Sequence, residues 1–90
     1  MSFLTKNYNR KKISFKRGKG SFLFSSSGEK YLDFVQGIAV NSLGHAHPRL
    51  VKAIKDQSKK LWHVSNAFQI PEGEKLAKNL CKKTFADYVM

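Results

Sequence analysis

The residues with the greatest potential for chemistry are His45 and His47, two positions apart within the segment Gly44–Pro48. Imidazole is a common metal ligand and acid–base group near neutral pH. A metal site would need a third ligand, such as His63 or Asp33. The alternative is structural, with one of the two rings capping and orienting this loop. We favour the structural interpretation, because no acidic residue lies near the two histidines in the sequence to complete a set of three ligands.

Other patterns typical of catalysis or cofactor binding are missing from the sequence. There is no Ser-His-Asp order, no Walker-type phosphate loop and no dinucleotide-binding fingerprint. The glycines of Gly18-Lys19-Gly20 are too few for such a loop and predict a turn. Cys81 is the only cysteine, which excludes an intramolecular disulfide and a cysteine-based zinc site. Cysteine usage of this kind favours a reducing compartment, so we expect a cytoplasmic protein.

Length and charge limit the function classes further. The chain has 90 residues, enough for at most one small domain, and a formal charge of +11. It contains no run of the ~20 apolar residues that span a bilayer, and basic residues interrupt its first 17 positions, so we expect neither a membrane span nor a secretory signal. The basic residues leave a remote alternative open, a small RNA-binding or interaction module. The lysines are scattered over the expected elements, so we expect no nucleic-acid or membrane partner.

Three short strands are expected in the first third of the chain, at residues 13–16, 21–24 and 30–35. They alternate apolar with polar residues and are separated by glycine-containing turns, which is typical of an antiparallel meander. The apolar run 38–40 does not alternate and predicts a buried extended segment.

Two helices are expected after the meander. The first covers about residues 48–61, because Pro48 suits a first helical position and apolar residues recur there with helical spacing. The second begins near Pro71, with acids in its first turn and lysines toward its end. Residues 85–90 resemble a turn that enters a strand, and a domain ending in this way is expected to be cut short.

Particular runs of residues resemble a known family. Tyr31–Pro48, which includes GIAVNSLGHAHP, closely resembles the amino-terminal signature of class-III aminotransferases. Leu61–Phe68, with the sequence LWHVSNAF, continues the resemblance, as do Pro71–Cys81 and Phe85–Asp87. The resemblance covers Tyr8 to Met90, and within the class it is greatest to members that act on N-acetylornithine.

This resemblance implies an α/β fold, the amino-terminal portion of the aspartate-aminotransferase-type (fold type I) pyridoxal-phosphate transferase fold. In that fold the antiparallel three-strand meander is followed by the two helices. The implied divisions are a basic arm at 1–12, a small-domain meander at 13–36, and a region at 37–90. That last region holds the substrate-side loop, both helices and the start of the large domain. The full-length family enzyme is implied to be a homodimer.

The implied activity is transamination with pyridoxal 5'-phosphate, between N-acetylornithine and 2-oxoglutarate in arginine biosynthesis. The alternatives within the class use ornithine, succinylornithine, 4-aminobutyrate or lysine. The family's Schiff-base lysine, phosphate-binding turn and pyridine-pairing acid are expected after Met90. No residue of this chain is therefore assigned to catalysis or to the cofactor, and the 90 residues alone are expected to be inactive.

The substrate-binding residues that the resemblance implies are Ile38, Ala39, Val40, Asn41 and Phe68. The first three match the family's substrate-lining stretch, and Phe68 belongs to the loop that faces the substrate side chain. Gln69 departs from the pattern, because many relatives have tyrosine there. That change puts the identity of the amino donor in doubt.

Overall fold

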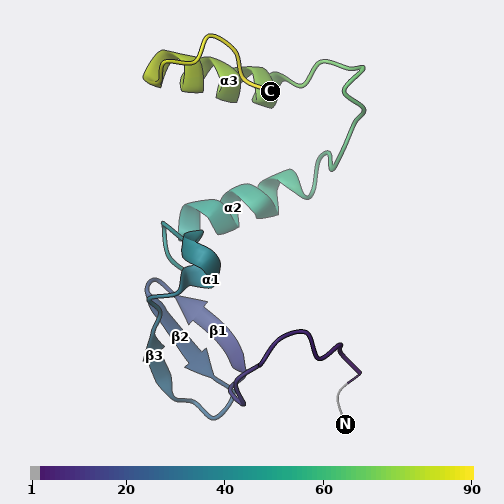
Figure 1. Cartoon of the computed structure of the whole chain (residues 1–90). Helices are drawn as coiled ribbons and strands as arrows, with labels where there is room; N and C mark the ends of the chain where they lie inside the picture. Colours follow the sequence, from purple (N-terminus) through teal and green to yellow (C-terminus); the bar gives the residue numbers. More distant parts are fainter. Residues whose placement is uncertain (1–2) are drawn as a thin grey trace. The chain divides into compact units, whose positions relative to one another are not determined.

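The computed structural model describes residues 3–90 and divides the chain into two units, Met1–Asp56 and Gln57–Met90 (Figure 1). The first two residues of the basic arm expected at 1–12 lie outside the described residues. The first unit holds three strands and two helices, and the second holds one helix.

A three-stranded antiparallel sheet lies in the first unit. It is formed by β1 (Phe15–Lys19), β2 (Phe22–Ser25) and β3 (Lys30–Leu32), in that spatial order. The central strand pairs with both neighbours, so that Phe24 lies opposite Arg17 on one side and Lys30 on the other. Aromatic residues spaced two apart suit a pleated strand of this kind. The expected antiparallel meander is confirmed.

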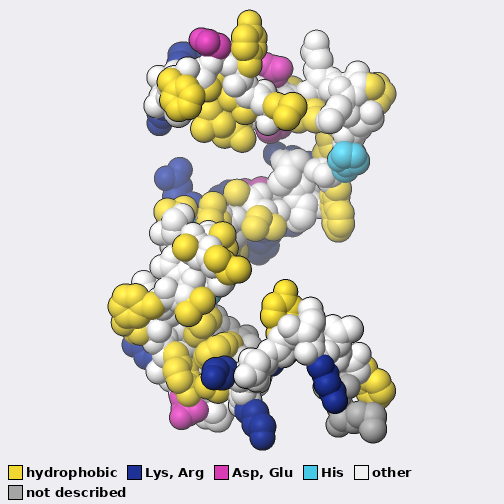
Figure 2. Space-filling model, viewed as in Figure 1, with side chains coloured by type: hydrophobic (Ala, Val, Ile, Leu, Met, Phe, Trp, Pro, Cys, Tyr) yellow, Lys and Arg dark blue, Asp and Glu magenta, His cyan; other side chains and the backbone are white. Residues whose placement is uncertain are grey.

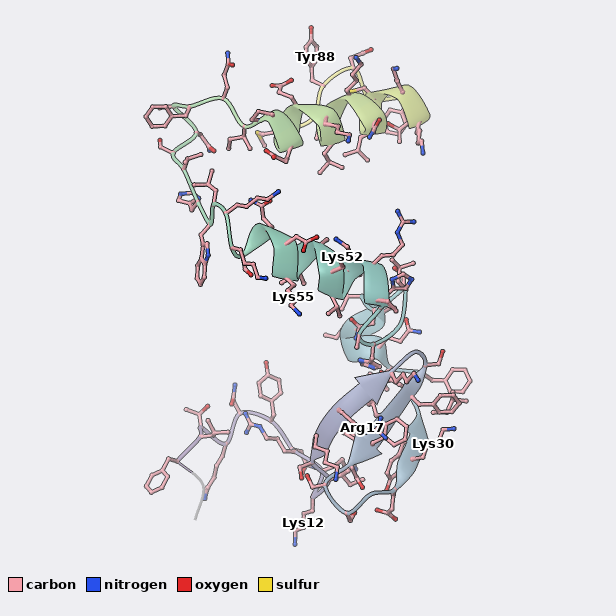
Figure 3. The ribbon with its side chains drawn as sticks, turned by 180° about the vertical axis from the view of Figure 1, so that it is seen from behind. Lys12, Arg17, Lys30, Lys52, Lys55 and Tyr88 are labelled. Atoms are coloured by element: carbon pink, nitrogen blue, oxygen red, sulfur yellow. The ribbon has the colours of Figure 1, made fainter. Side chains whose placement is uncertain are left out.

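Two cations lie over aromatic rings of β2, on the sheet face that Phe22 and Phe24 share. The guanidinium carbon of Arg17 is 3.6 Å from the centre of the Phe24 ring. The ammonium of Lys30 is 3.9 Å from the centre of the Phe22 ring (Figure 3). Cation–π contacts contribute about 0.5–1 kcal/mol each at exposed sites. They stabilise a sheet in which the described residues provide no buried apolar layer.

The first turn of the sheet comes later than predicted. β1 continues through Gly18 and Lys19, and the turn is made by Gly20 and Ser21. Gly20 has φ +55°, which glycine adopts at no steric cost. This position of the strand requires glycine, because the ring of His45 occupies the space that a side chain on Gly18 would need. The prediction of a turn at Gly18-Lys19-Gly20 is wrong in its first two residues.

The third strand ends at Leu32, three residues before the predicted end. The cause is Asp33, whose carboxylate oxygen Oδ1 accepts hydrogen bonds from the backbone N–H groups of Val35 and Gln36, at 3.0 and 2.8 Å. Capture of two successive N–H groups by one side chain turns the backbone and competes with the strand ladder.

A single helical turn, α1 (Gln36–Ala39), follows the sheet and was not predicted. Its interior is irregular: Gly37 has φ 75° and ψ −91°, and Ile38 has φ −140° and ψ 69°. The side chains of Ile38 and Val40 are 89% and 74% exposed. The prediction of a buried extended segment at 38–40 is therefore wrong, because an apolar run without alternation fits a coiled, exposed loop equally well.

The helix α2 (Pro48–Gln57) starts where predicted, with proline at its first position. Its predicted end at Leu61 is wrong by four residues. The backbone N–H of Lys60 donates to the Gln57 carbonyl at 3.0 Å, and the side-chain amide of Gln57 donates to the Leu61 carbonyl at 2.9 Å. These bonds form a turn after the helix.

The helix α3 (Pro71–Lys83) lies in the second unit and confirms the helix expected from Pro71. Glu72 and Glu74 lie in its first turn, and Lys82 and Lys83 lie in its last turn. Both placements favour the helix dipole, by about 0.3–1 kcal/mol for each charge. None of the helices within residues 3–90 is long and apolar enough to cross a membrane.

Residues 84–90 form no strand, so the predicted strand entrance at 85–90 is wrong. The hydroxyl of Thr84 donates to the Leu80 carbonyl at 2.8 Å, and the N–H of Ala86 donates to that hydroxyl at 3.2 Å. These bonds turn the chain as it leaves α3. A strand also needs a neighbour to pair with, and the second unit offers none among its described residues.

No apolar side chain between residues 3 and 90 is buried, and Ser25 is the one buried residue, at 2% exposure. Hydrophobic side chains are visible on the surface of each unit in Figure 2. Burial of apolar area supplies most of the free energy that offsets chain entropy. The described part of the chain therefore lacks the usual source of folding stability.

We expect the isolated 90-residue chain to show no cooperative thermal unfolding, because it has no buried apolar core to lose. Circular dichroism followed from 5 to 90 °C, with sedimentation to establish the mass, checks this. A sharp transition in a monomeric sample would contradict it.

Candidate functional site

The described histidines and acids include one tight pair, His45 with Asp33. The ring N–H at Nε2 of His45 donates to Oδ2 of Asp33 at 2.6 Å. The side chain of Asp33 is 6% exposed and that of His45 is 21% exposed. A short hydrogen bond to a largely buried carboxylate is strong, because little water competes for it.

The backbone of His45 is attached to the sheet independently of its side chain. Its N–H donates to the Gly20 carbonyl at 2.8 Å, and its carbonyl accepts from the Gly20 N–H at 3.0 Å. Gly44, with φ +79°, lies so close that a Cβ there would come within 2.9 Å of the Gly20 backbone. The loop after α1 is therefore fixed to the turn between β1 and β2.

The carboxyl of Asp33 has its pKa lowered by its surroundings. The largest cause is the hydrogen bond from the Gln36 N–H, followed by the bond from His45, and the Val35 N–H adds to them. Burial acts in the opposite direction but is outweighed. Groups that donate hydrogen bonds to a carboxylate favour its charged form. Asp33 therefore remains an anion to lower pH than an ordinary aspartate.

Strained backbone lies between the two members of this pair. Gln36 has φ 53° and Ala39 has φ 55°, and Ala46 immediately after the pair has φ 53°. Residues with a Cβ enter this left-handed region at a cost of roughly 1–2 kcal/mol each. Such residues cluster at sites where a fold imposes a particular backbone shape for binding or catalysis. Segment 36–41 is therefore a candidate binding segment on structural grounds.

Four of the five predicted substrate residues, Ile38 to Asn41, lie together in and directly after α1. The carbonyl of Asn41 accepts from the Gly44 N–H at 2.8 Å and closes the following turn. Ile38 and Val40 are open to solvent, as a surface that contacts a ligand must be.

The fifth predicted residue, Phe68, lies in the second unit and is 68% exposed. Its N–H donates to the Ser65 carbonyl at 3.0 Å, and the Ser65 hydroxyl accepts from the Ala67 N–H at 3.2 Å. Phe68 and Gln69 line a shallow hollow of about 420 Å³ before α3. Ser65 thus shapes the loop that presents Phe68.

His47, the second histidine of the segment Gly44–Pro48, makes backbone contacts at the start of α2. Nδ1 of His47 accepts from the Arg49 N–H at 3.3 Å, and the His47 carbonyl accepts from the Val51 N–H at 3.0 Å, so this residue caps the start of α2. This contact is of the kind that the structural interpretation of the two histidines expects. Within residues 3–90 no three histidine, cysteine, aspartate or glutamate side chains are grouped closely enough to hold a metal ion.

Comparison with known proteins relates this geometry to a family. The model of the class-III aminotransferase family matches residues 3–90. An acetylornithine aminotransferase of Agrobacterium fabrum is 60% identical over 82 residues, which are 91% of this chain and 21% of that protein. The crystal structure of N-acetylornithine aminotransferase from Stenotrophomonas maltophilia matches with a TM-score of 0.75 and 40% identity, over 83% of this chain and 21% of that one.

A second group of structures matches the fold at lower identity. Ornithine δ-aminotransferase of Plasmodium falciparum has a TM-score of 0.88 and 29% identity, over 96% of this chain and 22% of that chain. The fold defined by the meander and the helices is thus that of fold-type I aminotransferases. The chain belongs to the class-III aminotransferase family. It spans about a fifth of the length of the curated relatives it matches.

The Asp33–His45 pair was not predicted from the sequence. Asp33 was considered only as a possible metal ligand, and His45 as a metal ligand or as a ring that orients its own loop, because a contact between positions twelve apart leaves no local periodicity. One signal was present: Asp33 lies inside the strand predicted at 30–35, where aspartate is disfavoured because its side chain commonly turns the chain. The pairing partner could not be read from that signal.

The packing of His45 on Gly18 leads to a stability prediction. It is tested in a chimera in which this chain replaces the matching 82-residue segment of the Agrobacterium fabrum relative. A Cβ on Gly18 would lie 2.5 Å from a ring atom of His45, so Gly18→Ala should destabilise the chimera by about 1–3 kcal/mol. Chemical denaturation measures this loss.

Gly73 provides the matched control, because a Cβ there meets Ile70 at an ordinary 3.7 Å within α3. Gly73→Ala should stabilise the chimera by about 0.4–1 kcal/mol. Equal effects of the two substitutions would show that His45 does not pack on Gly18.

The lowered pKa of Asp33 predicts a pH dependence. A carboxyl with a lowered pKa in the folded state contributes stability that is fully present above its unfolded pKa, about 3.9. This contribution is lost as the pH falls through the folded pKa. We expect the chimera to be more stable than its Asp33→Asn variant at pH 7, and the difference to shrink below about pH 4. Urea denaturation of both proteins between pH 7 and pH 3 tests this, and a difference that grew with acidity would contradict it.

Proposed function

We propose that this chain forms the amino-terminal segment of an aminotransferase that moves an amino group between N-acetylornithine and 2-oxoglutarate. The observation that carries the proposal is the 50–60% identity to acetylornithine aminotransferases over at least 91% of the chain. We also propose that such an enzyme works in arginine biosynthesis, in the cytoplasm, as a homodimer. The free thiol of Cys81 supports a reducing compartment.

The proposed role of the chain is to shape the substrate side of the active site. The residues proposed to contact the amino donor are Ile38, Ala39, Val40, Asn41 and Phe68. The strained backbone and the exposure of this segment support the assignment. In domain terms, residues 13–36 would belong to the small domain, and 37–90 would hold the substrate-side loop, the helices and the start of the large domain.

Pyridoxal 5'-phosphate is the cofactor proposed for the whole enzyme. When bound, it supplies an electron sink for the bonds at the substrate carbon. The described residues do not fit a site for it by themselves, since a lysine that binds the aldehyde works in an enclosed pocket and every lysine side chain within residues 3–90 is exposed. No reaction step is therefore assigned to a residue of this chain.

Ornithine is the alternative amino donor, and the fold match does not distinguish it, because an ornithine aminotransferase has a TM-score of 0.88 and an acetylornithine aminotransferase one of 0.87. The identity to that ornithine aminotransferase is 29%, about half of the 60% identity to the acetylornithine aminotransferase of Agrobacterium fabrum. Donor preference therefore decides between the candidates, and the same assay covers succinylornithine, 4-aminobutyrate and lysine.

The chimera should transaminate N-acetylornithine with a kcat/KM at least tenfold above that for ornithine. Ala39→Trp should raise the KM for N-acetylornithine at least tenfold, because a large ring would occupy donor space, and leave the absorbance of the bound cofactor unchanged. Steady-state kinetics and the absorbance spectrum measure both effects.

Ala53→Trp is the matched control, because it adds the same ring at an exposed position of α2. It should leave the KM within twofold. Preference for ornithine would overturn the proposed donor. An unchanged KM in Ala39→Trp, or loss of the cofactor, would overturn the assignment of this segment to the substrate.

A further inference from the structure

The chain leaves the sheet at Asp33 and returns to it at His45, and both residues are attached to the same turn. The N–H of Asp33 donates to the Ser21 carbonyl at 2.8 Å. The N–H and carbonyl of His45 pair with the carbonyl and N–H of Gly20. The two ends of the intervening loop are thus fixed side by side on the turn between β1 and β2.

The side chains join these two ends directly. Oδ2 of Asp33 accepts from Nε2 of His45 at 2.6 Å, while Oδ1 holds the N–H groups of Val35 and Gln36. One carboxylate therefore binds the end of the loop and the start of α1 at the same time. The ring of His45 cannot shift toward the sheet, because it lies directly on Gly18.

The loop held in this way has a conformation that its own residues do not favour. Gln36 and Ala39 both have positive φ, and Ile38 between them is neither helical nor fully extended. Hydrogen bonds inside the loop span three or four residues, such as the bond from the Val40 N–H to the Gln36 carbonyl at 3.1 Å. Such local bonds do not fix the loop relative to the sheet, so its position depends on the attachment at its two ends.

We propose that Asp33 and His45 are positioning residues, which hold the loop Gln36–Asn41 in the shape that receives the amino donor. They act through the loop and need not touch the donor themselves. This inference rests on the proposed function, which assigns Ile38 to Asn41 to the substrate side.

The test compares variants of the chimera by KM, kcat and cofactor absorbance. Asp33→Asn should raise the KM for N-acetylornithine about tenfold, with kcat changed less than twofold and cofactor content unchanged. His45→Leu should have the same effect. His45→Gln should restore a KM within threefold of the unaltered chimera, because its amide N–H can replace that of Nε2.

Two further comparisons separate positioning from general stability. The double variant Asp33→Asn/His45→Leu should be no worse than either single variant, because both remove one interaction. Asp56→Asn is the matched control, since Asp56 pairs with Lys52 in an exposed ion pair on α2. It should change neither KM nor kcat.

The proposal is overturned if both single variants keep the unaltered KM. It is also overturned if they lose stability or cofactor while the KM of the remaining active enzyme is unchanged. If Asp33→Asn does not yield soluble protein, the KM values of the two His45 variants decide. A KM that is raised in His45→Leu and restored in His45→Gln supports the proposal, and an unaltered KM in His45→Leu overturns it.

Failure of the proposed function gives a different result. A chimera inactive toward N-acetylornithine refutes that function, and the positioning role is then judged by amide hydrogen exchange. Faster exchange within residues 36–45 in Asp33→Asn, with Asp56→Asn unchanged, supports the positioning role. Unchanged exchange there overturns it.

Discussion

Both oxygens of the Asp33 carboxylate are bound, one by backbone N–H groups at the start of α1 and the other by the ring of His45. The end of β3 and the direction of α1 depend on the first two of these bonds, and the third reinforces the return of the loop, which the backbone pairing of His45 with Gly20 also holds. Few apolar contacts could take their place, because no apolar side chain within residues 3–90 is buried. In this unit polar groups specify the conformation that a core specifies in larger domains.

Glycine and histidine complement each other around this carboxylate. Gly18 gives the His45 ring its space, and Gly44 allows the loop backbone to approach Gly20. The attachment of the loop at both ends then holds the backbone of Gln36 and Ala39 at positive φ. Where a fold holds residues in a costly conformation, binding is a common reason. In this chain that conformation occurs in the segment proposed to contact the amino donor.

The sequence allowed prediction of those features that local physical chemistry determines. Alternating residues gave the antiparallel meander, and Pro48 and Pro71 gave the starts of α2 and α3. Element ends were predicted less well, because side chains set them: Asp33 stops β3 and Gln57 forms the turn after α2. Of the candidate site, segment 38–41 was identified by its resemblance to the family. Its exposure and its attachment through His45 could not be predicted, because they depend on how residues distant in sequence are placed.

The exposed apolar side chains have a consequence for biosynthesis. A protein of the relatives' length is about five times as long as this chain, and ribosomes add roughly 5–20 residues per second. The surfaces that would cover these side chains are then made on the order of tens of seconds later. During that interval the nascent segment of such a protein would present apolar side chains such as Trp62 and Phe85 to solvent. In such a protein these side chains would reach their final packing only after the rest of the chain had been made.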